Sequence, residues 1–166
     1  MIILGLDPGY AIFGYGIVEM KGNKFTPIDY GVVTTNSNEK MEDRLKHIYD
    51  SLTEIIQKYK PDVVSIEELF FNTNNKTVIF VSQARGVGVL ACANAGLPIN
   101  EYTPLQIKMA LVGYGRAEKK QVQIMTKTLL GLNEIPKPDD AADALGAAIC
   151  HGNSSGGQNR IAQYIK

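Results

Sequence analysis

The first third of the chain alternates short apolar runs with turn-forming residues, a pattern typical of β-strands. Such runs cover residues 2–7, 12–20 and 25–35, and residues 21–24 join the second run to the third as a hairpin. Pro27 interrupts the third run, which indicates an edge strand, because proline has no backbone N–H for a neighbouring strand. We therefore predict three antiparallel strands in this part of the chain.

Beyond residue 40 the apolar spacing changes to that of helices. Apolar side chains recur every three or four positions from Met41 to Tyr59, and Pro61 ends this helix. The rest of the pattern predicts strands at 62–66 and 98–102 and helices at 76–95, 104–113, 115–130 and 139–151. This order predicts an α/β fold with a mixed five-stranded sheet and helices on both faces. The first and fourth strands should lie side by side in its centre.

Four acidic residues occupy positions where an ordinary core would avoid charge. Asp7 ends the first apolar run, Glu67 follows the run at 63–66, and Asp140 and Asp143 open an Ala-rich helix. Two adjacent strand ends would bring Asp7 close to Glu67, and an i, i+3 pair shares one helix face. Buried carboxylates repel one another unless a cation binds them, and hard cations such as Mg²⁺ prefer oxygen ligands. The sequence therefore predicts a metal site assembled from distant segments.

Length and composition are those of one globular domain. The chain has 166 residues, of which 45% are hydrophobic and 20% charged. We predict a folded domain over residues 1–152 and a flexible tail over 153–166. The sequence has no apolar segment of membrane-spanning length, no signal peptide, and two cysteines, Cys92 and Cys150, without metal-type spacing. We therefore expect a cytoplasmic protein with free thiols and no membrane partner.

Charge is balanced overall but unevenly distributed. Residues 69–133 hold seven basic and two acidic side chains, whereas residues 1–68 hold seven basic and eleven acidic ones. A basic segment beside an acidic pocket suits a polyanion that is held in one place and cut in another. A solvated helical face would give the same count, so charge alone leaves both interpretations open.

Six motifs together resemble the RuvC family of Holliday junction resolvases. They are ILGLDPGY at 3–10, GYG at 14–16, IEELF at 66–70, QARG at 83–86, AEKKQVQ at 117–123 and DAADAL at 140–145. The resemblance covers about residues 2–151 in order and at matching spacing. It implies a ribonuclease H-like fold and a homodimer that cuts four-way DNA junctions with Mg²⁺ or Mn²⁺. It also implies paired symmetric nicks that leave a 5′-phosphate and a 3′-hydroxyl, in recombination and repair.

The resemblance implies a role for each motif residue. Asp7, Glu67, Asp140 and Asp143 would be the catalytic carboxylates and the ligands of two metal ions, with Asp7 bridging them. Local geometry adds three expectations of its own: Glu68 should point away from the site, Asp139 should cap the last helix, and His151 should lie too far along that helix to bind the same metal.

The same resemblance implies the DNA contacts. Lys108, Lys119 and Lys120 would contact the DNA backbone, and Phe70 would stack on an unpaired base of the junction. Arg85 could serve the DNA or the dimer contact. The small-residue run at 86–89 could form the dimer interface or pack against the sheet. Coupling to a branch-migration helicase is a further implication of the family.

Three alternatives compete with this interpretation. One is another ribonuclease H-like nuclease that acts on RNA, which the Asp-x-Gly opening alone would fit. Another is a catalytically inactive junction-binding module, disfavoured because all four carboxylates are present. An actin-like ATPase shares the same opening, but it needs a second domain that 166 residues cannot hold.

Overall fold

A five-stranded mixed sheet forms the centre of the molecule. The computed structural model describes residues 1–69 and 75–164, with side chains for 1–69 and 78–155. The strands are β1 (Ile2–Asp7), β2 (Ile12–Lys21), β3 (Lys24–Thr34), β4 (Val63–Glu67) and β5 (Ile99–Tyr102). Their order is β3-β2-β1-β4-β5; β1 and β3 are antiparallel to β2, and β4 is parallel to β1 and β5. The predicted mixed sheet, its central β1–β4 pair and the edge strand with Pro27 are confirmed.

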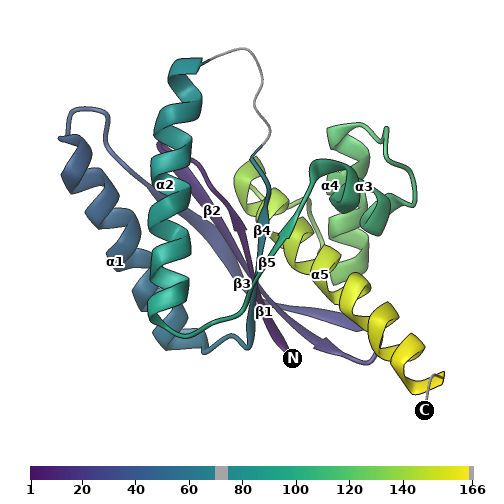
Figure 1. Ribbon diagram of the computed structural model, residues 1–166. Coiled ribbons are helices and arrows are strands. Elements are labelled where there is room, and N and C mark those ends of the chain that lie inside the picture. The colour runs from purple at the N-terminus through teal and green to yellow at the C-terminus, as the bar shows by residue number, and fades with distance from the viewer. Residues whose placement is uncertain (70–74, 165–166) are drawn as a thin grey trace.

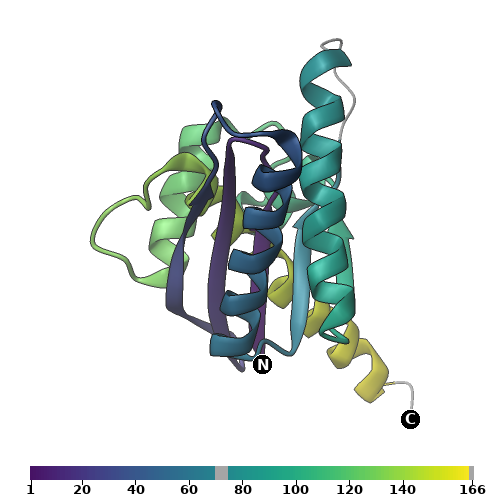
Figure 2. The same ribbon diagram turned by 90° about the vertical axis from the view of Figure 1, so that its left-hand side faces the viewer.

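Helices cover both faces of the sheet, as predicted (Figures 1 and 2). One face carries α1 (Met41–Tyr59) and α2 (Asn75–Asn94), which pack against each other. The other carries α5 (Asp139–Tyr164), with α3 (Pro104–Val112) and α4 (Lys119–Leu130) beside it. No helix in the described part of the chain is long and apolar enough to cross a membrane.

Two predicted helix boundaries are wrong. The helix expected from residue 115 begins at Lys119, because Glu118 adopts an extended conformation and forms a capping box with Gln121. The helix expected to end at His151 continues to Tyr164. Polar residues that we interpreted as a tail support this extension: the Asn153 amide donates to the Ala110 carbonyl at 2.9 Å, and the Ser154 hydroxyl donates to the Cys150 carbonyl at 2.8 Å. The flexibility of the expected tail stays a prediction.

Large side chains fill the space between the sheet and the α1–α2 layer. Phe13, Leu52 and Ile66 are fully buried there, together with Ile48 from α1. Gly88 of α2 faces this layer, because a Cβ added to it would lie 2.8 Å from the ring of Phe13. The two helices therefore rest on the sheet through large branched and aromatic side chains.

The opposite face is packed far more closely. A Cβ added to Gly5 of β1 would lie 1.9 Å from the carbonyl oxygen of Ala144, and one added to Gly14 of β2 would lie 2.1 Å from that of Asp140. The backbone of α5 thus touches the strand backbones, and only glycine fits at these two strand positions. This contact fixes the position of the α5 N-terminus over the ends of β1 and β2.

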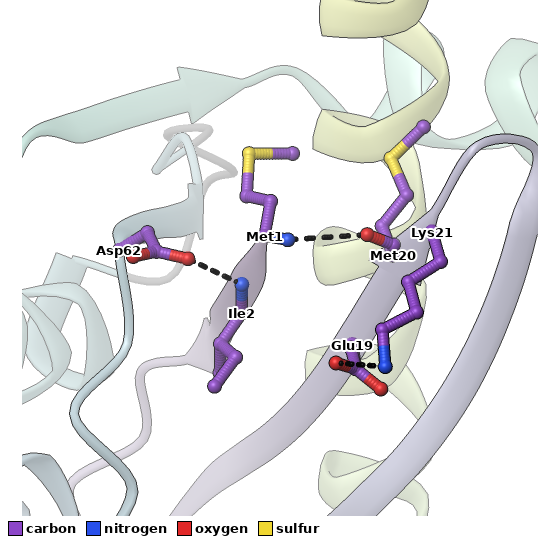
Figure 3. A network of polar contacts seen from close by, with 6 residues as sticks. All are labelled: Met1, Ile2, Glu19, Met20, Lys21 and Asp62. Atoms are coloured by element: carbon purple, nitrogen blue, oxygen red, sulfur yellow. Dashed lines mark hydrogen bonds and ion pairs between the residues drawn. The ribbon is translucent and has the colours of Figure 1, made fainter.

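Hydrogen bonds at the start of β1 tie it to both of its neighbours, β4 and β2. The Ile2 N–H donates to Oδ2 of Asp62, just before β4, at 2.7 Å, and the Met1 ammonium donates to the Met20 carbonyl at 3.1 Å (Figure 3). In the resulting parallel pair, Leu6 lies opposite Ile66. The last residues of the two strands, Asp7 and Glu67, are therefore level with each other.

Candidate active site

Four carboxylates from three elements gather at the C-terminal ends of β1 and β4. Asp7 and Glu67 end these neighbouring strands, and Asp140 and Asp143 lie in the first turns of α5. Gly14 is the register partner of Asp7 and contacts the backbone of Asp140. The structure thus brings together the four residues that the sequence singled out, although their catalytic roles stay predictions.

Burial and mutual repulsion raise the pKa values of three carboxyl groups of this cluster, those of Asp7, Glu67 and Asp143. Burial is the main cause for Asp7, and the nearby Asp143, Glu67 and Asp140 add to it, so that its pKa rises to about 7. The pKa values of Glu67 and Asp143 are also raised, again chiefly by burial. The cluster is therefore unfavourable in its fully ionised form unless positive charge approaches it.

The donor set fits a hard divalent cation, which binds oxygen ligands and offsets their charge. In the described residues, no three Asp, Glu, His or Cys side chains are placed closely enough to form a ready-made metal cage. Small side-chain movements would therefore have to accompany metal binding. Asp7 is the natural centre of such a site, because all three other carboxylates raise its pKa.

Lys119 supplies the positive charge nearest to the cluster. Its ammonium lies 3.1 Å from the Asp143 carboxylate and 3.2 Å from that of Asp139. We expected Asp139 to cap α5, but its exposed carboxylate binds Lys119 instead, and this hydrogen bond lowers the pKa of Asp139. The contact places an ammonium directly beside Asp143, where it could also reach a phosphate oxygen.

A cavity of about 260 Å³ opens beside the carboxylates. It is lined by Glu67, Asp143, Lys108 and Lys119, together with Pro104, Ile107, Val122 and Gly146. Two carboxylates and two lysines thus line one cavity, a combination that can hold a metal-bound phosphate. Lys120 is exposed and lies outside this lining, and Glu68 is exposed as well.

The remaining predicted contacts fall into different environments. The Arg85 guanidinium forms an ion pair with Glu101 of β5, which places it between α2 and the sheet edge. Gly88 faces the sheet, whereas a Cβ added to Gly86 would meet nothing within 4 Å. The small-residue run therefore divides between intramolecular packing and an open outer face. Phe70 lies outside the described residues.

Sequence reasoning missed a buried hydrogen bond between β4 and α5. The Ser65 hydroxyl is fully buried and donates to the Ala147 carbonyl at 2.6 Å. Ser65 is two residues before Glu67 on the strand, and Ala147 is one helical turn after Asp143. The bond thus joins the two elements within a few residues of their carboxylates. Its only sequence signal was a hydroxyl within an apolar run.

His151 lies away from the carboxylates, in agreement with the prediction. Its Nδ1 is 2.9 Å from the Tyr102 hydroxyl, at the end of β5. This pair ties the middle of α5 to the strand next to β4, so it supports the fold rather than the cluster.

The family profile for Crossover junction endodeoxyribonuclease RuvC matches residues 3–151. The chain belongs to the RuvC family. It is 59% identical to the crossover junction endodeoxyribonuclease RuvC of Ruminiclostridium cellulolyticum over 93% of each chain. The predicted family and enzyme class, a nuclease that acts on DNA, are therefore confirmed.

Solved RuvC structures confirm the fold class. The Thermus thermophilus RuvC structure has a TM-score of 0.87 at 35% identity and covers 93% of this chain and 95% of that one. RuvC of the same organism in complex with a Holliday junction substrate has a TM-score of 0.86 at 33% identity, with the same coverage. The RuvC arrangement thus extends over nearly the whole chain.

Proposed function

We propose that this RuvC family member resolves four-way DNA junctions by hydrolysing one phosphodiester bond in each of two opposite strands. The convergence of Asp7, Glu67, Asp140 and Asp143 beside a lysine-lined cavity carries the proposal. Family membership supports it, as does the solved complex of the Thermus thermophilus relative with a Holliday junction. The expected products carry a 5′-phosphate and a 3′-hydroxyl.

The four carboxylates would hold divalent metal, with Mg²⁺ as the preferred ion and Mn²⁺ as a substitute. Two bound ions would lower the pKa of the attacking water and offset charge on the leaving oxygen. Asp7 would hold metal at the centre of the cluster, since the other three carboxylates all raise its pKa. Glu67 would complete one side of the site, and Asp140 and Asp143 the other.

The lysines would position the DNA backbone. Lys108 and Lys119 line the cavity with Glu67 and Asp143, so we assign them to the phosphates on either side of the cut. Because Lys119 already touches Asp143, binding a phosphate would require it to exchange or share this contact. Lys120, Arg85 and Phe70 are proposed as outer DNA contacts, with Phe70 stacking on an unpaired base.

The proposed assembly is a homodimer that places two active sites on one junction. The outer face of α2 supports this proposal: Ile79 and Leu90 are 58% and 51% exposed and lie eleven residues apart, on the same side of the helix as Gly86. A second copy of the same face would cover them. A cytoplasmic location and cooperation with a branch-migration helicase complete the proposal.

Cleavage of a labelled synthetic junction tests the function. With Mg²⁺, the protein should nick two opposite strands of the junction and leave a linear duplex of the same sequence intact, and EDTA should stop the reaction. Asp7→Asn should lower the cleavage rate at least about 1000-fold, because it removes the central carboxylate, while junction binding stays within about twofold.

Other outcomes would support the competing functions. Binding of the junction without cleavage by the unmodified protein would favour an inactive module. Cleavage of RNA or of linear duplex would favour another nuclease of the same fold. Equal loss of binding and cleavage in Asp7→Asn would contradict a purely catalytic role for Asp7.

A further inference from the structure

A second cavity lies on the other side of the α5 N-terminus. Its volume is about 430 Å³, and it is lined by Gly9, Tyr10, Ala11, Ile12, Phe80, Val81 and Asp140. Asp140 borders this cavity, and Asp143, one turn later, borders the cavity with the lysines. The catalytic carboxylates thus lie between two cavities of different chemical character.

An aromatic pair forms the wall of this second cavity. The rings of Tyr10 and Phe80 stack with their centroids 5.1 Å apart and their planes at 27°. Phe80 is nevertheless 43% exposed, so part of its ring faces solvent. A stacked pair with one accessible ring is a suitable surface for a further planar group.

A buried arginine packs against the Tyr10 ring of this pair. The Arg44 guanidinium lies 3.8 Å from the centroid of the Tyr10 ring, and Arg44 is only 9% exposed. The Thr35 hydroxyl accepts a hydrogen bond from Arg44 Nε at 2.9 Å and donates to the Tyr10 carbonyl at 2.7 Å. Both the ring and the backbone of Tyr10 are held in place, which lowers the entropic cost of binding a ligand.

The charge of the lining selects the kind of ligand. The described lining contains no lysine or arginine, and its one ionisable side chain besides Tyr10 is the acidic Asp140. A phosphate would be repelled here and attracted to the neighbouring cavity, where Lys108 and Lys119 lie. A neutral planar group fits the aromatic cavity, and nucleobases stack on aromatic side chains whatever their sequence.

We propose that the Tyr10–Phe80 cavity binds a nucleobase of the strand being cut, next to the phosphate held at the carboxylates. This inference rests on the proposed function and adds a base-binding subsite to it. The backbone of the strand would continue toward Lys108 and Lys119, while its base would turn across Asp140 and stack on the exposed part of the Phe80 ring.

The test uses a four-way junction carrying 2-aminopurine at successive positions around the cut, mixed with full-length protein in EDTA so that no strand is cleaved. With the unmodified protein, the fluorescence should change most at a nucleotide adjacent to the cut. Phe80→Leu should abolish this change and weaken junction binding about 5- to 100-fold, because it keeps an apolar side chain but removes the ring. Phe80→Tyr should preserve both. Ile28→Ala, at a residue of similar exposure (45%) on β3, is the control and should change neither.

Each outcome decides the inference. Unchanged binding and unchanged probe signal in Phe80→Leu would overturn it, as would a probe in the unmodified complex that responds nowhere near the cut. Dissociation of a dimer by Phe80→Leu, measured by sedimentation, would show instead that the cavity faces a second copy of the chain. If the unmodified protein cuts the junction with Mg²⁺ but the probe is silent, only the subsite fails; absence of cleavage would reject the proposed function itself.

Discussion

The two faces of the sheet are packed by different means. The α1–α2 face is separated from its helices by large side chains such as Phe13 and Leu52, whereas the α5 face has glycines in contact with the helix backbone. Large side chains can shift rotamers and absorb small changes, but a backbone-to-backbone contact cannot. The face with the least adjustable packing is the one that carries Asp140 and Asp143, so one layer stabilises the fold and the other also fixes the positions of two of the four clustered carboxylates.

Paired substitutions on the two faces should separate these roles most strongly. Gly14→Ala introduces a Cβ 2.1 Å from the Asp140 carbonyl oxygen and must displace α5. We expect at least a 100-fold loss of cleavage, since a displacement of about 1 Å can cost that much. Leu52→Ala should destabilise the protein by about 2–5 kcal/mol but keep cleavage within a few-fold. The two variants are compared by their single-turnover cleavage rates, measured at a temperature below the melting temperatures of both.

A milder variant covers the case in which Gly14→Ala does not fold. In Gly16→Ala, the new Cβ would lie 2.8 Å from the Leu145 side chain and 3.0 Å from its backbone nitrogen, a less severe clash than the one at Gly14. It should retain the fold and lose less activity than Gly14→Ala. If Leu52→Ala lost as much activity per folded molecule as the glycine variants, the distinction between the two faces would be wrong.

The stability contributed by residues on the α5 face should also depend on pH, whereas that contributed by the α1–α2 face should not. The pKa of Asp7 is about 7 in the folded protein, whereas its ordinary value is 3.8. Between these two pH values the folded state therefore retains a proton that the unfolded chain has released. The stability contributed by this proton is complete below pH 3.8 and is lost as the pH rises through 7. In EDTA, the melting temperature of Asp7→Asn should therefore be several degrees above that of the unmodified protein at pH 8 and nearly equal to it at pH 4. For a protein of this size, each kcal/mol of stability shifts the melting temperature by about 2–4 °C.

Added Mg²⁺ should reverse this difference in melting temperature between Asp7→Asn and the unmodified protein. Added Mg²⁺ should raise the melting temperature of the unmodified protein at pH 8 and that of Asp7→Asn much less, because only the former keeps the central ligand. Leu52→Ala should show the same pH and Mg²⁺ response as the unmodified protein. A constant gap between Asp7→Asn and the unmodified protein across this pH range would argue against a buried, repelled Asp7.

The smallest expected effect concerns a hydroxyl on each face. Ser65→Ala removes the buried bond to the Ala147 carbonyl and should lower the free energy of unfolding by about 1 kcal/mol. It should also raise the Mg²⁺ concentration for half-maximal cleavage a few-fold, because β4 and α5 are no longer tied beside Glu67 and Asp143. The control is Ser82→Ala, whose hydroxyl donates within α2 to the Val78 carbonyl at 2.7 Å. It should change neither quantity; an unchanged Mg²⁺ requirement in Ser65→Ala would leave Ser65 a purely structural role.

Much of the fold could be predicted from local patterns. Alternation and helical spacing predict every strand and helix of the described structure, and the neighbouring positions of β1 and β4 follow from element order. The acidic residues that follow the apolar runs of β1 and β4 indicate the carboxylate cluster from the sequence alone. These predictions succeed because each depends on periodicity or on a charge at an apolar position.

The features that escaped prediction depend on contacts between distant segments. Nothing near Asp139 in sequence indicated that it would bind Lys119, and nothing near Arg85 indicated Glu101. The extension of α5 past His151 depends partly on the Ala110 carbonyl, which lies on α3. Asp62 looked like an ordinary strand start, although its carboxylate accepts a hydrogen bond from the first residue of β1.

The contact between Gly5 and Ala144 joins residues near opposite ends of the chain, and this has a consequence for synthesis on the ribosome. A nascent chain has exposed Asp7 and Glu67 well before Asp140 and Asp143 have been translated. Only when α5 emerges and docks on the glycines of β1 and β2 can all four carboxylates face the same point. Translation products that stop before residue 139 would lack half of the acidic cluster, so incomplete chains should be unable to nick chromosomal DNA.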